Sequence, residues 1–275
     1  MAVRNEKPSA IDDAIIKHMK KKLMQYLSIV PLLYLGACAY LYFAQRSMLY
    51  FPTPATEITG AEKITLVSDG EKLRIWHVGP AKGDAILYFG GNAEDVADVA
   101  PAFSKNFPLQ SIYLVNYRGY GGSTGVPSEA GIFKDALNVY DFVSTKHHAG
   151  TISVIGRSLG SGVAIYVAAN RKVKQMVLTT PYDSIENVAK KQFPMFPISL
   201  LLKDKFASNE RAASISIPIL VILAVADEVI PRANSDALIT AFHRSVPMRK
   251  IVQNSSHNSV LTSDDYWRDV GDFLR

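Results

Sequence analysis

The sequence predicts an α/β domain in which helices cover both faces of a mostly parallel sheet of eight strands. Two apolar, β-prone stretches come early in the chain without a helix between them, and later stretches alternate with segments of helical periodicity. Because parallel strands need a crossover connection, which is usually a helix, this alternation is typical of a sheet covered on both faces.

The expected elements follow from the positions of these patterns. Strands are expected at Lys63–Val67, Leu73–Val78, Ala85–Phe89, Ser111–Tyr117, Thr151–Ile155, Gln175–Thr179, Ile217–Val225 and Arg249–Gln253. Helices are expected at about Glu94–Asn106, Glu129–His147, Leu159–Asn170, Pro231–His243 and Asp264–Leu274.

An uncharged apolar segment, Leu23–Phe43, precedes the domain, which we expect to occupy residues 44–275. As a helix this segment would be about 31 Å long, enough to cross a hydrocarbon core of about 30 Å. Tyrosines near both of its ends suit the membrane interface, and Pro31 does not prevent insertion. The sequence therefore predicts a transmembrane anchor at 23–43.

Basic residues lie mainly on one side of this segment. Residues 1–22 hold six Lys or Arg and three Asp or Glu, whereas Arg46 is the only basic residue within Ala44–Glu62. The positive-inside rule then predicts a cytoplasmic N-terminus and a domain on the non-cytoplasmic side. Three alternatives stay open for the apolar segment: a buried core helix, a cleaved signal peptide, or a lipoprotein signal in which Cys38 is lipidated.

Composition excludes several classes of function. The chain is 48% hydrophobic with a net charge of +5, and the positive excess lies mostly in residues 1–22, so no nucleic-acid partner is expected. Cys38 is the only cysteine, which excludes an internal disulfide and a cysteine-based metal site. The six histidines show no metal-ligand spacing. We therefore expect no metal and no cofactor.

The most informative stretch is TISVIGRSLGSGVAIYVAAN (151–170). Its β-prone residues run directly into Gly156-Arg157-Ser158-Leu159-Gly160, and an apolar helix follows. Glycines two residues before and two after the serine permit a sharp strand–turn–helix that holds the hydroxyl away from the backbone. The sequence therefore predicts that Ser158 is the nucleophile of a nucleophile elbow.

A second match to the same pattern surrounds Ser123 in the stretch RGYGGSTGVP (118–127). This serine lies in a glycine-rich loop, several residues past the nearest strand, and Pro127 follows before a helix can begin. We therefore expect Ser123 to be an ordinary loop serine.

An acylating serine needs a base, and the base needs an acid that orients it. Asp227 directly follows the strand Ile217–Val225, and His257 follows the strand Arg249–Gln253. Both side chains are thus expected just past the carboxyl ends of strands, near Ser158. The chain order serine, aspartate, histidine is that of the α/β-hydrolases.

Two other carboxylates compete with Asp227 for the role of the acid. Asp183 also follows a strand, but Asp183-Ser184-Ile185-Glu186 has the spacing of a helix capping box, which favours a structural role. Glu228 lies farther from the strand end. The other candidate histidines are expected to be packing or surface residues: His77, His147, His148 and His243.

Attack on a carbonyl creates an oxyanion, which needs preorganised N–H donors. The backbone N–H of Leu159, directly after the nucleophile, is one expected donor. The other is the backbone N–H of Asn92 in the Gly90-Gly91-Asn92 loop, because paired glycines after the strand Ala85–Phe89 let this loop fold toward the serine.

One insert interrupts the alternation, between the strands Gln175–Thr179 and Ile217–Val225. Its apolar residues are too many for an isolated surface loop: Met195, Phe196, Ile198, Leu200, Leu201, Leu202 and Phe206. We expect a small helical cap at about 193–213, over the edge of the sheet that holds the serine. An extra helix packed on the flank of the domain is the alternative.

With these residues placed, the chain resembles the membrane-anchored α/β-hydrolases of the ABHD and serine-aminopeptidase-like group. The resemblance runs from the end of the anchor to the C-terminus through QRSMLYFPTP (45–54), YFGGNAE (88–94), NYRGYGGSTGVPSEAG (116–131), GRSLGSG (156–162), TTPYDSIENVA (179–189), LLLKDKFAS (200–208), ADEVIP (226–231) and SSHN (255–258). It implies the α/β-hydrolase fold, with Ser158, Asp227 and His257 as the triad and Asn92 and Leu159 in the oxyanion hole. One departure is that the family usually has a supportive His, outside the triad, where Gly90 stands in this chain.

The family includes esterases, lysophospholipid or monoacylglycerol lipases and protein depalmitoylases. The predicted function is a membrane-anchored serine hydrolase that cleaves acyl esters or thioesters, with a small-molecule or lipid acyl ester as its substrate. A catalytically silent scaffold or ligand receptor on the same fold, or a serine peptidase, is the alternative.

Overall fold

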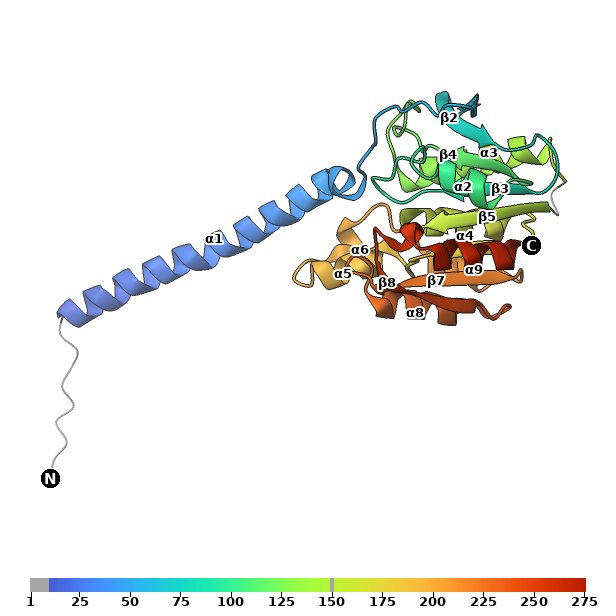
Figure 1. Cartoon of the computed structure of the whole chain (residues 1–275). Coiled ribbons are helices and arrows are strands. Elements are labelled where there is room, and N and C mark those ends of the chain that lie inside the picture. Colours follow the sequence, from blue (N-terminus) through green and yellow to red (C-terminus); the bar gives the residue numbers. More distant parts are fainter. Residues whose placement is uncertain (1–9, 149–150) are drawn as a thin grey trace. The chain divides into compact units, whose positions relative to one another are not determined.

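The computed structural model describes residues 10–148 and 151–275 and divides into two compact units, one ending at Gln45 and the other spanning Arg46–Arg275. Helix α1 (Ala10–Leu49) forms the first unit and supplies the first residues of the second (Figure 1). Within the described part of the chain, no helix meets the combined demands of length and apolar character for crossing a bilayer. The span expected at 23–43 stays a prediction.

The second unit is built on one sheet of eight strands. In chain order they are β1 (Glu62–Ser68), β2 (Glu71–Val78), β3 (Ala85–Phe89), β4 (Ser111–Val115), β5 (Ile152–Arg157), β6 (Met176–Thr179), β7 (Ile219–Ala226) and β8 (Met248–Ser256). Their spatial order is β1-β2-β4-β3-β5-β6-β7-β8, in which only the β1–β2 and β2–β4 pairs are antiparallel. The predicted eight-stranded, mostly parallel sheet is confirmed.

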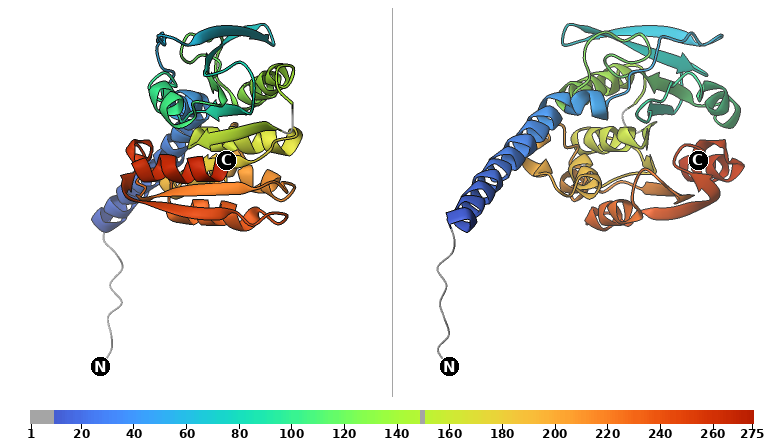
Figure 2. Two further views of the ribbon diagram at one scale, coloured as in Figure 1. Left: turned by 45° about the vertical axis from the view of Figure 1, so that its right-hand side comes forward. Right: turned by 90° about the vertical axis from the view of Figure 1, so that its left-hand side faces the viewer.

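Helices cover both faces of this sheet. One face packs against α3 (Glu129–Ser144), α4 (Leu159–Asn170) and α8 (Arg232–Ala241), and the other packs against α2 (Ala100–Asn106) and α9 (Asp264–Leu274). In the right-hand view of Figure 2, α4 and α9 lie on opposite sides of the strands. Strand β3 shows the cause: Ala85, Leu87 and Phe89 enter one core while Ile86 and Tyr88 enter the other. A strand buried on both faces is continuously apolar, as this one is.

Three helices differ from the sequence-based boundaries, and at two of them a side chain near the expected end has another partner. The helix expected from Glu94 begins only at Ala100, and the Asp95 carboxylate instead accepts from the Ala97 backbone N–H in a turn. The helix expected to reach His147 ends at Ser144, and the His147 ring contacts the Gly83 carbonyl at 2.9 Å. The helix expected at Pro231–His243 spans Arg232–Ala241.

The insert between β6 and β7 contains three short helices, α5 (Ile185–Gln192), α6 (Ile198–Leu201) and α7 (Ser208–Ala212). The assignment of Phe206 to a cap is wrong, because its side chain is fully buried in the domain core with its ring 5.2 Å from that of Phe133. Leu200, in contrast, is 82% exposed. The insert's role as a cap stays a prediction.

A serine and a glutamate hold the first helix of the insert. The expected capping box at Asp183 is wrong by one position, because the Ser184 hydroxyl caps α5 by accepting from the Asn187 backbone N–H at 3.0 Å. Glu186 then bonds to Lys190, Lys205 and Ser199, and these contacts lower the pKa of its carboxyl to about 2. The insert is thus tied together by ion pairs at its surface.

Candidate active site

Ser158 lies between the end of β5 and the start of α4, with φ 48° and ψ −117°. A non-glycine residue with positive φ is strained, and its neighbours must hold it. Both nearby glycines are required by close approach: a Cβ on Gly160 would collide with the carbonyl oxygens of Phe89 and Gly90, and one on Gly156 would collide with the carbonyl of Gly160. The predicted strand–turn–helix is therefore present at this serine.

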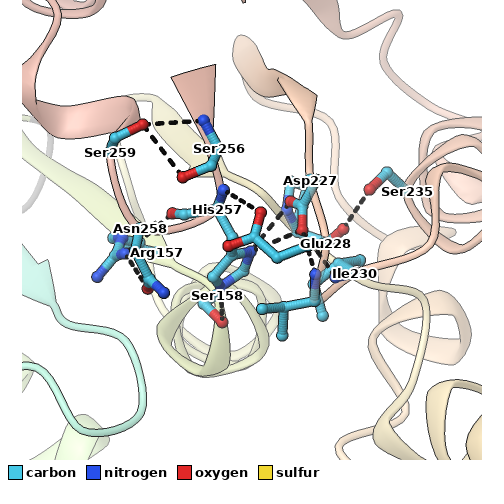
Figure 3. A network of polar contacts seen from close by, with 12 residues as sticks. Arg157, Ser158, Asp227, Glu228, Ile230, Ser235, Ser256, His257, Asn258 and Ser259 are labelled. Carbon is cyan, nitrogen blue, oxygen red and sulfur yellow. Dashed lines mark hydrogen bonds and ion pairs between the residues drawn. The ribbon is translucent and has the colours of Figure 1, made fainter.

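The structure brings the three predicted triad residues into one chain of hydrogen bonds (Figure 3). Ser158 Oγ lies 2.9 Å from His257 Nε2. On the other side of the ring, His257 Nδ1 lies 2.9 and 3.0 Å from the two carboxylate oxygens of Asp227. In the tautomer that satisfies all three groups, Nδ1–H donates to the carboxylate and Nε2 accepts from the serine hydroxyl.

Strand pairing explains why the acid and the base meet. Ala226 of β7 pairs with Ser256 of β8. The next residue in the chain is Asp227 after Ala226 and His257 after Ser256, so the acid and the base lie side by side. The two loops are then fixed by backbone contacts: the Asp227 carboxylate accepts from the backbone N–H of Ile230 at 2.8 Å, and Glu228 accepts from the His257 backbone N–H at 3.1 Å. Glu228 therefore holds the histidine loop through the backbone, whereas Asp227 is the one of these two carboxylates that is hydrogen-bonded to the ring.

The environment of Asp227 keeps its carboxyl ionised. Burial raises the pKa of this group, but the hydrogen bond from His257 and those from the backbone N–H groups of Ile230 and Val229 outweigh burial, so the pKa lies below its ordinary value. Because the folded-state pKa is lowered, the resulting stabilisation is complete above the ordinary aspartate pKa and is lost as pH falls through the lowered value. A charged acceptor is thus available to His257 at neutral pH.

The loop after β3 borders the nucleophile, as the sequence predicted. A Cβ added to Gly91 would lie 3.5 Å from the Ser158 Cβ. The Gly91 backbone N–H donates to Glu94 at 2.7 Å, whereas, among the described residues, the backbone N–H groups of Asn92 and Leu159 have no hydrogen-bond acceptor. These two groups are the expected oxyanion donors, and their role stays a prediction.

Arg157 and Glu94 form a buried ion pair beside the site, which the sequence analysis missed. Arg157 Nη1 lies 2.6 Å from Glu94 Oε2, and Arg157 Nη2 donates to the backbone carbonyl of His257 at 3.0 Å. Burial lowers the pKa of this guanidinium, but Glu94 and Tyr88 outweigh burial and the pKa lies above its ordinary value. One side chain thus connects the loop after β3 to the histidine loop. Its position next to the predicted nucleophile was the only signal in the sequence.

The rejected candidates have structural partners elsewhere. Ser123 Oγ accepts from the Arg74 backbone N–H at 2.8 Å and donates to the Asn116 carbonyl, which holds a buried turn. The Asp183 carboxylate accepts from the side-chain amides of Asn187 and Asn234. Neither residue contacts His257.

A second chain of the same residue types joins Glu62, His77 and Ser111. His77 Nδ1 lies 2.9 Å from Glu62, and His77 Nε2 lies 2.8 Å from Ser111 Oγ. The side chain of Ser111, however, has no solvent exposure. Within the described ranges, no three His, Cys, Asp or Glu side chains gather in a way that could hold a metal ion.

Comparison with known proteins places this geometry in a family. A family model described as the alpha/beta hydrolase fold matches residues 88–213. An uncharacterized protein of Mycobacterium tuberculosis is 32% identical over 244 residues, covering 84% of this chain and 86% of that protein. The chain belongs to the α/β-hydrolase family.

Two further similarities extend the comparison of this α/β-hydrolase. An uncharacterized membrane protein of Saccharomyces cerevisiae is 29% identical over 255 residues, covering 88% of this chain and 89% of that protein. The structure of an esterase from Pyrococcus furiosus matches with a TM-score of 0.64 at 16% identity, covering 81% of this chain and 97% of the esterase. The similarity to the P. furiosus esterase shows that the two proteins share a fold.

The Arg157–Glu94 pair predicts an unequal response to loss of two arginines. Arg157→Met should lower the free energy of unfolding by about 3–5 kcal/mol, because it leaves the Glu94 carboxylate buried without its cation. Arg171→Met is the control, since the Arg171–Asp141 pair lies at the surface, and it should cost at most about 1 kcal/mol. Urea unfolding of both variants measures the difference. Equal losses would mean that the buried pair does not stabilise the α/β-hydrolase domain.

Proposed function

We propose that this α/β-hydrolase is a membrane-anchored serine hydrolase that cleaves acyl esters or thioesters through an acyl-enzyme. The observation that carries the proposal is the unbroken hydrogen-bond chain from Ser158 through His257 to Asp227, with the serine on a strained turn. A serine hydroxyl becomes a strong nucleophile only when an oriented base takes its proton.

Each residue then has one role in the reaction. Ser158 Oγ attacks the carbonyl carbon of the substrate, and its proton passes to His257 Nε2. Asp227 stabilises the imidazolium that forms and holds the ring in place. The leaving alkoxide or thiolate takes the proton from Nε2, which leaves an acyl-serine. Water then attacks the acyl carbon and gives a proton to His257 Nε2. As the bond from this carbon to Ser158 Oγ breaks, Nε2 returns the proton to Oγ, and the acid departs.

The negative charge that develops on the carbonyl oxygen needs donors that are already in place. Leu159 directly follows Ser158 in the sequence, and Asn92 follows Gly91, where an added Cβ would lie 3.5 Å from the Ser158 Cβ. Neither backbone N–H has an acceptor among the described residues. In our proposal both groups donate to the oxyanion. Preorganised donors of this kind stabilise the transition state more than the ground state, so they increase kcat.

Replacement of the nucleophile tests the proposal. Ser158→Ala should lower turnover of a p-nitrophenyl ester by at least about 10⁴-fold, because it removes the attacking oxygen. The same variant should lose labelling by a fluorophosphonate probe, which requires an activated serine. Ser123→Ala is the control, since it changes the other G-x-S-x-G serine, and it should retain labelling. Retained turnover in Ser158→Ala would refute the proposal.

The exposed apolar side chains of α1 support the anchor. In the first unit, Leu32, Leu33 and Phe43 are 67%, 68% and 80% exposed. Many exposed apolar side chains on one helix are unfavourable in water. Their burial in a bilayer would be favourable by about 25 cal/mol for each Å² of apolar surface removed from water. The S. cerevisiae relative is itself named a membrane protein. We therefore place the anchor at 23–43, with residues 1–22 in the cytoplasm.

A topology reporter tests this placement. Fused after Gly60, the reporter should give the non-cytoplasmic signal, because the exposed lysines of α1 precede the apolar stretch and favour the cytoplasm. The same reporter fused at the N-terminus serves as the control and should give the opposite signal. A cytoplasmic signal from both fusions would contradict the orientation.

We further propose that the insert selects the acyl chain. Helices α5 and α6 follow β6 at the edge of the sheet where the parallel strands end (Figure 1), which is also the edge that bears Ser158. Leu200 of α6 is 82% exposed there and offers apolar surface to a long acyl chain. An acetyl group is too short to use it.

Two exposed leucines provide a matched test. Leu200→Gln should lower kcat/KM for a long-chain ester by about 5- to 10-fold, which corresponds to about 1 kcal/mol of lost apolar contact. It should leave the acetate ester unaffected. Leu109→Gln is the control, because Leu109 is 79% exposed just before β4, at the opposite edge of the sheet. Equal effects of the two substitutions on the long-chain ester would exclude a role of α6 in substrate choice.

A further inference from the structure

The segment Arg46–Phe51, which includes the last turn of α1 and the first two residues after it, is hydrogen-bonded to the predicted oxyanion loop. The Asn92 side-chain amide donates to the backbone carbonyl of Leu49 at 2.6 Å, and the Asn92 amide oxygen accepts from the backbone N–H of Phe51 at 3.0 Å. Both ends of one amide are thus paired with backbone groups two residues apart. This pairing fixes the distance and the orientation of the loop relative to the segment.

Tyr120 closes this arrangement into a ring of hydrogen bonds. Its hydroxyl donates to the Asn92 amide oxygen at 2.8 Å and accepts from the Phe51 backbone N–H at 2.9 Å. The tyrosine is 2% exposed, and burial raises the pKa of its hydroxyl, so it remains a neutral donor. Asn92 therefore has three polar partners, none of them a triad residue.

The other side of the segment is held by a buried carboxylate. Asp204 is 5% exposed and accepts from Arg46 Nε at 3.0 Å and from the Tyr50 hydroxyl at 3.1 Å. Hydrogen bonds that involve a charged group are about twice as strong as neutral ones. Arg46–Phe51 is thus fixed to the insert on one side and to the oxyanion loop on the other.

The oxyanion loop needs this external support because its own backbone is strained. Ala93, directly after Asn92, has φ 60°, a conformation that costs about 1–3 kcal/mol in a non-glycine residue. Glu94 holds the loop from within through the Gly91 backbone N–H. The Asn92 side chain is its attachment on the outside.

We propose that Arg46–Phe51 is a positioning element of the oxyanion hole and acts through the side chain of Asn92. This inference rests on the proposed function, in which the Asn92 backbone N–H donates to the oxyanion. Loss of the side-chain contacts leaves that N–H in the chain but displaces it from the developing charge. A displaced donor stabilises the oxyanion of the transition state less well, whereas it affects binding of the uncharged substrate carbonyl little. We therefore expect kcat to fall while KM changes little.

The first test compares two asparagines in the full-length protein. Asn92→Ala should lower kcat for a p-nitrophenyl ester by about 10- to 100-fold with KM within about threefold. Asn106→Ala is the control, since Asn106 is also partly buried and donates to a backbone carbonyl, that of Ala102, in α2. Active-site titration with a fluorophosphonate gives the fraction of folded, reactive sites, so that kcat is corrected for any unfolded protein.

The second test addresses the segment itself through one backbone N–H. Phe51→Pro removes the N–H that binds Asn92 and Tyr120, and it should reduce kcat as Asn92→Ala does. Phe51→Ala removes the ring but keeps the N–H, so it should lower kcat less than Phe51→Pro does. If both changes act through one contact, the double variant Phe51→Pro/Asn92→Ala should be no slower than Asn92→Ala alone.

Tyr120→Phe removes only the hydroxyl and should lower kcat by about three- to tenfold.

These measurements separate failure of the inference from failure of the proposed function. Wild-type kcat in both Asn92→Ala and Tyr120→Phe, or a loss fully explained by fewer titratable sites, would overturn the inference while Ser158-dependent turnover still supported the hydrolase. A wild-type protein without Ser158-dependent turnover would overturn both.

Discussion

The strained backbone of Ser158 is the constraint on which the active site depends. A serine at φ 48° persists only where β5 and α4 are packed tightly enough to hold it. That packing brings α4 against the carbonyls of Phe89 and Gly90 at Gly160, where no side chain fits. The close approach that permits the elbow therefore also brings the loop after β3 to the serine. The predicted nucleophile and the predicted oxyanion loop are therefore positioned by the same close packing at Gly160.

The surrounding loops are fixed by polar groups that the triad does not use. Arg157 connects Glu94 to the carbonyl of His257, and Asn92 connects the same loop to the segment Arg46–Phe51. A buried ion pair gains little net free energy over apolar packing, because desolvation offsets the attraction. The two side chains must nevertheless keep their positions, since a buried charge without its partner lowers stability. Such contacts therefore favour one arrangement of the loops over nearby alternatives, which is what an oxyanion hole requires.

Local patterns in the sequence predicted the elements well. Ala85–Phe89, Leu159–Asn170 and Asp264–Leu274 are found with the expected boundaries, because strand and helix periodicity depends on near neighbours. The elbow was predictable for the same reason. Serine, aspartate and histidine could be selected because parallel strands bring their carboxyl ends to one edge.

Contacts between distant residues were not predictable from spacing. Glu94 was expected to begin a helix, but it binds Arg157, 63 residues away. Phe206 was assigned to a cap, but it fills the core against Phe133. Gly90 stands where the resembling family has histidine, and here a Cβ would already lie 3.0 Å from Val96 Cγ1. For Glu94 and Phe206 a partner far along the chain determines the role of the residue, and periodicity carries no information about that partner.

The two chains of carboxylate, histidine and serine show what such a site needs beyond hydrogen bonds. Glu62–His77–Ser111 reproduces the order and the distances of Asp227–His257–Ser158. Ser111, however, lies within β4 with no exposed surface, so a substrate carbonyl cannot reach it. Ser158 follows a strand at a turn with a strained backbone, and it is 9% exposed. Among the described residues, the backbone N–H groups of Leu159 and Asn92 have no acceptor. Access and oxyanion donors, both set by the position of the serine in the fold, therefore distinguish the candidate nucleophile from a serine that only completes the packing of the core.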